Sequence, residues 1–341
     1  MLYTYTLPES RIAQTPASPR DSAKLFVYHT ATGKIELDTF LHLDRYLPKE
    51  SLLIMNETKV LPCRVFALTS KNEAVELLVM TNEWKPSDRI LKATANKKLH
   101  PGEKVKLPEG HTLTVLESTE KIFQFSADFP LSKLPHVLAR IGEMPLPRYI
   151  EHCPLTEEEK RRKYQTFFAK KPGSVAAPTA SLHFTPRLLK KLATQGVHPE
   201  FLTLHVGLGT FAPVLPEHLE SKTLYKEYYE IPTSTLKALE KRKRANKPLI
   251  AVGTTATRAL ESFAKTKASS GLTDLFILPP YSFQMLDGLI TNFHVPGSSL
   301  MMLVESFLQH KKAKHHLKEL YEIALKKDFH FYSFGDGMLI L

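Results

Sequence analysis

Short apolar runs alternate with polar, turn-forming segments along most of the chain. Residues 52–55 and 249–252 are continuous apolar runs of strand length, which is typical of strands buried on both faces of a sheet. From residue 164 onward, strand-like runs alternate with segments of helical length, such as 186–194 and 256–265. This alternation predicts an α/β main domain, with a mixed sheet covered by helices.

Residues 62–130 have a different pattern, in which short strand-like segments follow one another without helices. The segments are 63–68, 74–80, 89–93, 104–107, 112–116 and 121–125, and polar or Gly/Pro turns separate them. Short strands at this spacing predict a small antiparallel barrel or sandwich. We therefore expect an inserted all-β barrel domain over 62–154, including a proline-rich link, within a catalytic α/β domain formed by 1–61 and 155–341.

The remaining elements are predicted from caps and punctuation. Thr156 is an expected N-cap, with acidic residues in the first helical turn and basic residues later, and Thr233 or Ser234 is expected to cap another helix. Residues 131–163 are expected to form a link restricted by proline at 135, 145 and 147, in which residues 142–147 are extended. We expect a strand over 275–278, a polar loop over 287–296, and helices near 299–309 and 314–327.

Charge narrows the class of partner. The chain has 341 residues, of which 43% are hydrophobic, and 46 Lys and Arg against 35 Asp and Glu give a formal net charge of +11. Such a surplus favours a polyanion such as RNA or DNA, or an anionic membrane, although a solvated basic surface gives the same composition.

Other composition features predict absences. The two cysteines, Cys63 and Cys153, form no CxxC pair, so we expect neither a disulfide framework nor a thiolate zinc site. The histidines show no tight ligand spacing, so no metal is expected. No signal-peptide pattern and no apolar stretch of ~18 residues occurs, which favours a cytoplasmic protein without a membrane partner.

Residues 164–211 carry the densest mixture of small and polar side chains. Gly207 and Gly209 indicate backbone brought close to a ligand, or two buried strands whose turns require glycine. His205 and His183 are candidate acid/base groups, because histidine titrates near neutral pH. A lone histidine in a strand is, however, more often a hydrogen-bonded core residue.

Two further segments suggest ligand contacts. Residues 253–258 form a strand-to-helix turn in which Thr254, Thr255 and Arg258 could hold an anion, or in which threonine only caps the helix. The segment lacks a Walker pattern, which argues against a nucleotide triphosphatase. Asn292 and His294 flank an aromatic residue, an arrangement suited to base recognition or to a structural loop.

Two other groups of polar residues lie near these segments. Asn56 and Thr58 follow a predicted buried strand, where α/β proteins place binding residues and where ordinary strand exits also lie. Glu227 is one of the carboxylates nearest the motifs, but its spacing identifies no acid/base couple.

Taken in order, the motifs resemble the QueA family, the S-adenosylmethionine:tRNA ribosyltransferase-isomerases. The likeness runs nearly end to end and is weaker over 62–154. It rests on residues 12–16 with 20–22, 56–64, 142–147, 164–211, 252–255, 287–294 and 332–336.

The resemblance implies a cytoplasmic enzyme of queuosine synthesis. S-adenosylmethionine would be the co-substrate, with no resident cofactor. Its ribosyl part would be transferred to 7-aminomethyl-7-deazaguanine at the wobble position of a tRNA anticodon loop and isomerised, giving epoxyqueuosine with release of adenine and methionine. A monomer is expected.

The chemistry of this reaction suggests roles for the candidate residues. A base must remove a proton from the carbon next to the sulfonium, and a donor must help adenine to leave. We assign His205 or His183 to acid/base chemistry, and Asn292 and His294 to the adenosine or modified base. Thr254, Thr255 and Arg258 are assigned to the methionine carboxylate or a tRNA phosphate. Close backbone approach is assigned to Gly207, Gly209 and Thr210.

Several positions depart from the family pattern. Ser181 stands where the family usually has glycine, and Arg148 replaces a proline. The family's His-x-Met-His-x-Glu run is represented here by residues 222–227, in which only Glu227 matches and Lys222 and Tyr225 replace histidines. These changes bear on the fine geometry of the site more than on the reaction class.

Two other functions remain open from the sequence. An S-adenosylmethionine-dependent RNA methyltransferase would use the same donor, but the expected third glycine after Gly209 is absent. A non-catalytic RNA-binding protein would use the barrel, but the barrel lacks a dense basic and aromatic pattern.

Overall fold

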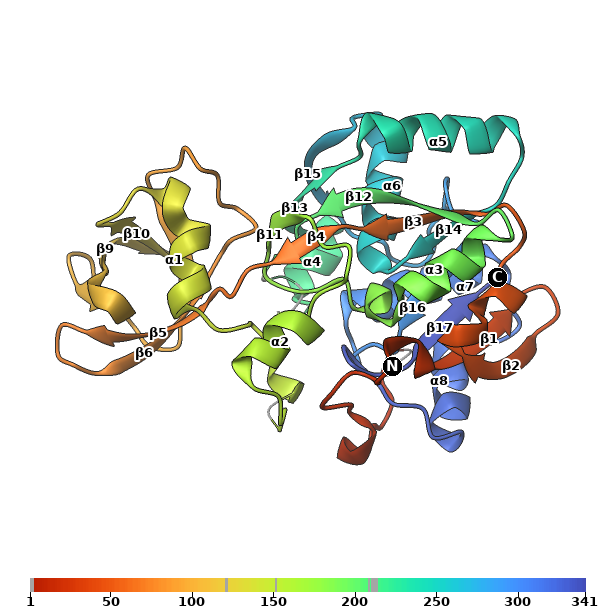
Figure 1. The fold of residues 1–341 in the computed structure, drawn as a ribbon, viewed down its shortest axis with the longest axis horizontal. Helices are drawn as coiled ribbons and strands as arrows, with labels where there is room; N and C mark the ends of the chain where they lie inside the picture. The colour runs from red at the N-terminus through yellow and green to blue at the C-terminus, as the bar shows by residue number, and fades with distance from the viewer. Residues whose placement is uncertain (1–2, 120–121, 151, 208, 210–213) are drawn as a thin grey trace.

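A nine-stranded mixed sheet forms the centre of the larger part of the molecule (Figure 1). The computed structural model describes residues 3–119, 122–150, 152–207, 209 and 214–341. In spatial order the strands are β15 (Ser270–Leu275), β13 (Thr223–Glu230), β12 (His198–Leu204), β3 (Leu52–Asn56), β14 (Leu249–Val252), β16 (Gly288–Asn292), β17 (Gly337–Ile340), β1 (Lys24–His29) and β2 (Lys34–Thr39).

The middle of this sheet is parallel. β3 pairs in parallel with β12 on one side and β14 on the other, and β14 pairs in parallel with β16. β13 and β15 extend one edge of the sheet antiparallel to their neighbours, and β17 is antiparallel to β16. Because β12, β3, β14 and β16 run in the same direction, their carboxyl ends meet at a single edge.

Both faces of the sheet are buried, as the continuous apolar runs predict. One face includes Ile54, Ala251 and Leu289, and it packs on helices from the C-terminal half of the chain. Those helices are α5 (Thr233–Arg244), α6 (Thr254–Thr266), α7 (Ser299–His310) and α8 (Leu317–Lys326). The other face includes Leu53 and Val252, and it packs on α3 (Pro186–Ala193) and the 3-10 helix η3 (Phe40–Arg45).

A separate closed barrel, at the left of Figure 1, has its own apolar core. Its strands, in spatial order, are β10 (Ile122–Ala127), β7 (Leu91–Ala95), β6 (Ala74–Val79), β5 (Arg64–Thr69), β8 (Lys104–Lys106) and β9 (Thr112–Thr119). Every strand pairing in it is antiparallel. An α/β main part with an all-β barrel confirms the predicted fold class.

Two passes of the chain join the barrel to the main sheet. Their backbones pair at an antiparallel bridge between Arg64 and Glu143. Beside this junction, β4 (Thr58–Val60) and β11 (Lys171–Ser174) form a two-stranded parallel sheet. Gln165 fastens β4, because its side chain both donates to the carbonyl of Val60 and accepts from its amide.

The helix predicted to start after Thr156 is confirmed. It is α2 (Glu157–Lys163), and Thr156 and Glu159 form a capping box. The helix predicted to be capped by Thr233 or Ser234 instead begins at Thr233, after Pro232, and has no side-chain cap. Proline at this position fixes an extended entry into the helix without a capping hydroxyl.

Several local predictions were wrong. The strand expected over 275–278 ends at Leu275, and the segment expected as a polar loop contains β16, whose five residues are all buried. Tertiary burial overrides the polar appearance of that segment, because its asparagine and threonine find partners inside the protein. The link over 131–163 also contains helix α1 (Leu134–Ile141), which was not predicted; Pro135 lies in its first turn, where proline is tolerated. Helix α4 (Pro216–Ser221) and strands β13 and β17 were not predicted.

Asp21 anchors α3 to the N-terminal segment. Its fully buried carboxylate accepts hydrogen bonds from the Thr185 hydroxyl at 2.6 Å and the Arg187 Nε at 2.6 Å. Thr185 is also the N-cap of α3, accepting from the amide of Leu188 at 3.2 Å. Burial opposes ionisation of Asp21, but its hydrogen bonds with Arg187 and Thr185 outweigh that effect, so its pKa lies below the usual range.

We predict that Asp21→Asn lowers the free energy of unfolding at pH 7 by about 1–3 kcal/mol, the cost of losing hydrogen bonds to a charged group. A carboxyl with a depressed folded pKa stabilises fully above its unfolded pKa of ~3.9, and this stabilisation is lost as pH falls through the folded pKa. The difference between variant and wild type, measured by urea unfolding, should therefore shrink below about pH 4.

The matched control is Glu36→Gln, which removes a carboxylate paired with Lys34 on β2, the partly exposed strand at the edge of the sheet. We expect a much smaller effect, because exposed pairs are screened by water. An equal loss of unfolding free energy from Asp21→Asn at pH 3 and pH 7 would mean that the charge of Asp21 does not contribute to this stabilisation.

Candidate active site

The predicted site residues gather mainly at the carboxyl edge of the parallel strands. Asn56 ends β3, His205 follows β12, Thr254 and Thr255 follow β14, and Asn292 ends β16. These positions are far apart in the sequence and come together because the four strands are parallel and adjacent. The crevice outside the carboxyl ends of such strands is where α/β proteins bind ligands.

His205 is held in a defined orientation at this edge. Its Nδ1 lies 2.8 Å from the Thr58 hydroxyl, and its ring stacks on Tyr228 with centroids 6.0 Å apart. Its backbone amide donates to the carbonyl of Tyr228 at 2.9 Å. Among the described residues, no hydrogen-bond partner engages its Nε2. The ring therefore offers one free nitrogen to a ligand.

The strand β11 closes one side of this imidazole. Gly173 has φ +146°, and a side chain there would meet ring atoms of His205 at 2.9 Å, so only glycine fits. Burial, together with the nearby charge of Lys171, lowers the pKa of His205 to about 4. The ring is therefore neutral at pH 7, when it can accept a proton.

Asn56 ties three elements together behind the edge. Its side-chain amide donates to the carbonyl of Leu204 at 2.9 Å and to the hydroxyl of Thr255 at 3.1 Å. Its oxygen accepts from the amides of Thr58 and Leu204, each at 3.1 Å. Both the Asn56 amide and the Thr58 hydroxyl thus contact protein partners, and Thr58 contacts His205 itself.

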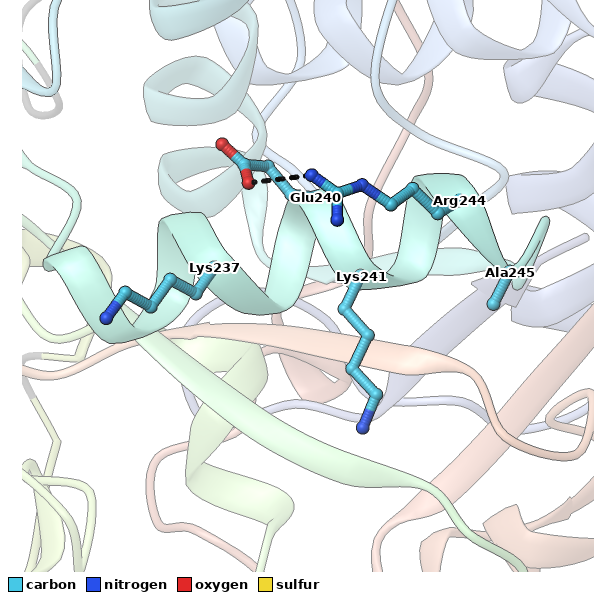
Figure 2. A pocket seen from close by; sticks show the side chains of 5 residues that line it. All are labelled: Lys237, Glu240, Lys241, Arg244 and Ala245. Atoms are coloured by element: carbon cyan, nitrogen blue, oxygen red, sulfur yellow. Dashed lines mark ion pairs between the residues drawn. The ribbon is translucent and has the colours of Figure 1, made fainter.

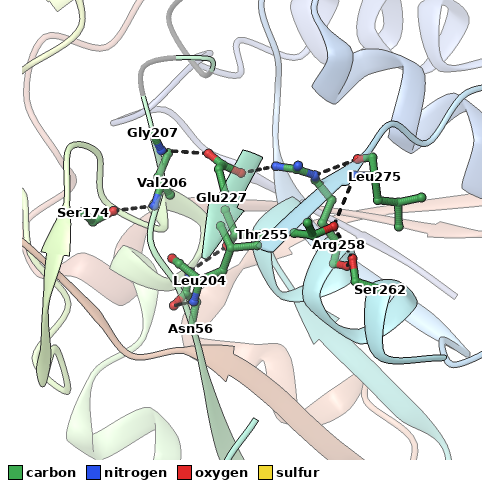
Figure 3. Close-up of polar contacts among 11 residues, drawn as sticks. Asn56, Ser174, Leu204, Val206, Gly207, Glu227, Thr255, Arg258, Ser262 and Leu275 are labelled. Carbon is green, nitrogen blue, oxygen red and sulfur yellow. Dashed lines mark hydrogen bonds and ion pairs between the residues drawn. The ribbon is translucent and has the colours of Figure 1, made fainter. Parts of the chain in front are cut away.

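Glu227 and Arg258 form a buried ion pair next to Gly207 (Figure 3). Oε1 of Glu227 accepts from the amide of Gly207 at 2.8 Å, and Oε2 pairs with Nη1 of Arg258. The Nε of Arg258 donates to the carbonyl of Leu275 at 3.1 Å. The structure thus separates Arg258 from Thr254 and Thr255, with which the sequence grouped it.

The turn before α6 has no side-chain cap. Gly253, the N-cap, has φ +90° and ψ 154°, a conformation that favours glycine. Thr254 is buried, and the hydroxyl of Thr255 is engaged by Asn56.

A second, deeper cluster contains His183 and Asn292. The amide nitrogen of Asn292 lies 3.4 Å from Nε2 of His183 and donates to the carbonyl of Asp336 at 3.3 Å, while its oxygen accepts from the Thr179 hydroxyl at 2.8 Å. His183 stacks on Phe40 with centroids 4.3 Å apart. Burial lowers the pKa of His183 to about 3.

Ser181 and His294 are also buried. Ser181 lies in the 3-10 helix η7 (Thr179–His183), where its hydroxyl has no hydrogen-bond partner among the described residues. The Nε2 of His294 lies 2.9 Å from the Thr291 hydroxyl, and its backbone amide donates to the hydroxyl of Tyr321 at 2.9 Å. Burial lowers the pKa of His294 to about 3.

The glycines after β12 lie against other side chains. A Cβ on Gly207 would meet the amide nitrogen of Asn82 at 2.7 Å, and one on Gly209 would meet the ring of Tyr225 at 2.5 Å. Thr210 lies outside the described residues. Within the described part of the chain, no group of three or more His, Cys, Asp or Glu side chains is placed to hold a metal ion.

Sequence reasoning missed Asn82, Gly173 and Tyr228. Asn82 comes from the barrel part of the chain, directly after β6, and is buried with an oxygen that lacks a hydrogen-bond partner among the described residues. No local pattern marks it, because its importance depends on the barrel packing against Gly207. Gly173 lay within the segment that was singled out, and its place directly after Pro172 was a usable signal.

A groove also lies along α5, away from these residues (Figure 2). It is lined by Lys237, Glu240, Lys241 and Arg244 of α5 and by Ala245, the C-cap of that helix. The C-terminal end of α5 leads into the first residue of β14, so this basic surface approaches the amino edge of the sheet, opposite His205. No helix in the described residues is long and apolar enough to span a membrane.

A parallel α/β sheet with an oriented, neutral histidine and a buried ion pair at its carboxyl edge is the arrangement of an enzyme that binds a polar small molecule. Comparison with known proteins identifies the family. The family model described as queuosine biosynthesis protein matches residues 1–340, and the chain belongs to this family.

Individual relatives agree with this assignment. An S-adenosylmethionine:tRNA ribosyltransferase-isomerase from Halothermothrix orenii is 41% identical, with 99% of this chain and 98% of the relative covered. One from Rubrobacter xylanophilus is 41% identical, with 99% and 96% covered. The crystal structure of S-adenosylmethionine tRNA ribosyltransferase from Thermotoga maritima matches with a TM-score of 0.56 at 29% identity, covering 100% of both chains.

We predict that the His205 imidazole titrates with a midpoint near pH 4, because burial disfavours its charged form. The measurement is an NMR pH titration of the histidine ring signals, assigned with a His205→Asn variant. His316, whose pKa is raised by its hydrogen bond and charge interaction with Glu305, is the internal control and should titrate above its usual midpoint. A His205 midpoint at or above 6.5 would contradict the burial of its ring.

Proposed function

We propose that this protein transfers the ribosyl moiety of S-adenosylmethionine to 7-aminomethyl-7-deazaguanine at the wobble position of a tRNA anticodon loop and isomerises it. The products are epoxyqueuosine-tRNA, adenine and methionine, and S-adenosylmethionine is a co-substrate, not a cofactor. The observation that carries this proposal is the full-length match to the queuosine biosynthesis family, together with the ribosyltransferase-isomerase relatives at 41% identity.

We assign the proton abstraction to His205. The reaction needs a base for the hydrogen on the 5′ carbon beside the sulfonium, and a base must be unprotonated at working pH. His205 meets this requirement because its pKa is depressed to about 4, its Nδ1 is held by Thr58, and its Nε2 is free among the described residues. The proton would therefore pass from the 5′ carbon to Nε2.

His183, Asn292 and His294 are better suited to positioning than to proton transfer. His183 and His294 are buried, neutral side chains with protein partners. The Asn292 amide holds η7 through Thr179, and η7 lies beside the turn that precedes α6, because a Cβ on Gly253 would lie 3.8 Å from the Cβ of Ala180. We propose that these residues hold in place the surface that the adenosine contacts.

The tRNA would approach over exposed lysines of β4 and β11, the strands whose Thr58 and Gly173 contact His205. Lys59, Lys170 and Lys171 are exposed on or next to β4 and β11, and Phe167 exposes 48% of its surface nearby in the sequence. Lysines contact phosphates, and an exposed aromatic ring can stack on an unpaired base. The net charge of +11 is consistent with this polyanionic partner.

The same proposal covers organisation and location. We propose a cytoplasmic monomer in which 1–61 and 155–341 form the catalytic domain and 62–154 form the inserted barrel with its link. The barrel would complete the site through Asn82, which reaches Gly207.

The test is to incubate the protein with S-adenosylmethionine and tRNA that carries 7-aminomethyl-7-deazaguanine, and to identify the small molecules released. We expect adenine and methionine, both dependent on that tRNA. The control is the same tRNA with unmodified guanine at the wobble position, which should yield neither. Release of S-adenosylhomocysteine would instead indicate methyl transfer and contradict the proposal.

We predict that His205→Asn lowers kcat by about 10²–10⁴-fold, the usual contribution of a general base. Asparagine keeps a polar group near Thr58 but has no basic nitrogen. The measurement is the rate of adenine release at saturating substrates. His42→Asn, on the exposed side of η3 beside Asp38, is the matched control and should keep wild-type activity. Full turnover by His205→Asn would exclude His205 as the base.

A further inference from the structure

The ion pair of Glu227 and Arg258 is buried, and burying two charges costs desolvation free energy. Glu227 is 3% exposed and Arg258 is 8% exposed. Removing two charges from water costs several kcal/mol per ion, and their attraction offsets this only when the remaining donors and acceptors are satisfied. A buried pair that is only partly satisfied therefore suggests a ligand.

One donor of this pair is unsatisfied. Nη1 of Arg258 pairs with Glu227 and Nε donates to the carbonyl of Leu275, but Nη2 is buried and has no hydrogen-bond partner among the described residues. A buried donor without a partner costs about 1–3 kcal/mol, and more when it is charged. A ligand acceptor at Nη2 would remove that cost.

A small cavity lies against the two charged side chains. Its volume is about 30 Å³, room for about two water molecules. Its walls are mostly apolar, and they include Leu224, Phe276, Ile277 and Leu303. Tyr225, which is 43% exposed, also lines the cavity and places it at the surface. The cavity thus combines one anion-binding donor, one carboxylate and apolar walls.

We infer that this cavity receives the carboxylate of the amino-acid head of S-adenosylmethionine at Nη2 of Arg258, with the ligand ammonium at the cavity mouth on the side of Glu227. The inference rests on the proposed function and names the subsite that this function needs. The apolar side chains around the cavity would contact the methylene carbons of the methionyl chain, which extends from the mouth. Gly207, whose amide binds Glu227, lies two residues from His205 and connects the subsite to the carboxyl edge.

The charge arrangement favours this head group over a tRNA phosphate. Arg258 alone would suit either anion, since arginine binds carboxylates and phosphates. Glu227 beside it repels a phosphate, which carries no compensating positive charge, but attracts an ammonium. The matched positive and negative ends of an α-amino acid therefore fit the pair, and Thr254 and Thr255 belong to a different part of the site.

The first experiment uses the wild-type protein and compares S-adenosylmethionine with its decarboxylated form, in the presence of the modified tRNA. The two donors have the same adenine, sugar and sulfonium, so the chemistry at the sugar is unchanged. We expect kcat/KM, measured as adenine release, to be about 10–100-fold lower for the decarboxylated donor. A loss of this size corresponds to the contribution of one charge-assisted hydrogen bond.

The second experiment repeats the comparison in Arg258→Met. Without the guanidinium, the protein should use both donors at similar kcat/KM, so that the ratio falls toward one. Arg242→Met is the matched control, because Arg242 also pairs with a carboxylate, Asp287, but at the amino edge of the sheet. This control should keep the wild-type ratio. Circular dichroism and thermal melting would show whether Arg258→Met folds. If it does not fold, the ratio of kcat/KM for the two donors in the wild-type protein alone tests the subsite.

The outcomes separate the subsite from the reaction. Equal use of both donors by the wild-type protein, with adenine released from each, would overturn the subsite and leave the proposed function intact. An unchanged donor ratio in folded Arg258→Met would also overturn it. Absence of adenine release from both donors would refute the proposed function, and the subsite with it.

Discussion

The parallel hydrogen bonding of β12, β3, β14 and β16 is the constraint on which the site depends. Both faces of these strands are covered, so the strands are fixed in register by apolar burial on each side. Their carboxyl ends therefore fall at one edge, and the amide of Asn56 joins three of the segments there. Without this alignment, residues 56, 205 and 254 would have no reason to meet.

Burial at this edge also sets the chemistry. His205, His183 and His294 all have depressed pKa values, for which desolvation is the largest cause. Yet the roles that we assign to them differ, because His205 is partly exposed and its Nε2 has no hydrogen-bond partner among the described residues. The same low-polarity surroundings make the Glu227–Arg258 pair costly unless its open donor is met by a ligand, which connects substrate binding to the stability of the pair.

Much of this organisation could be predicted from local sequence. Apolar runs of four or more residues located β3 and β14, and the change to short strands separated by turns located the barrel. The helix beginning after Thr156 followed from its capping box. Where prediction failed, tertiary burial overrode local appearance. The segment of β16 resembles a polar loop because its sequence contains polar residues, but these residues find hydrogen-bond partners inside the protein. Arg258 resembles part of an anion-binding turn because it follows Thr254 and Thr255, but its carboxylate partner, Glu227, lies on a strand distant in the sequence.

The sequence by itself determined the fold class, the family and most of the chemically active residue types, because local periodicity, caps and ordered motifs are properties of neighbouring residues. Only the tertiary structure decided which of those residues meet. It placed Thr58 on the His205 ring, Asn82 of the barrel against Gly207, and Glu227 on Arg258. The physical reason is that solvent exclusion and long-range hydrogen bonds arise between segments distant in sequence, so that no local pattern records which histidine stays accessible or which charge is buried without a full set of partners.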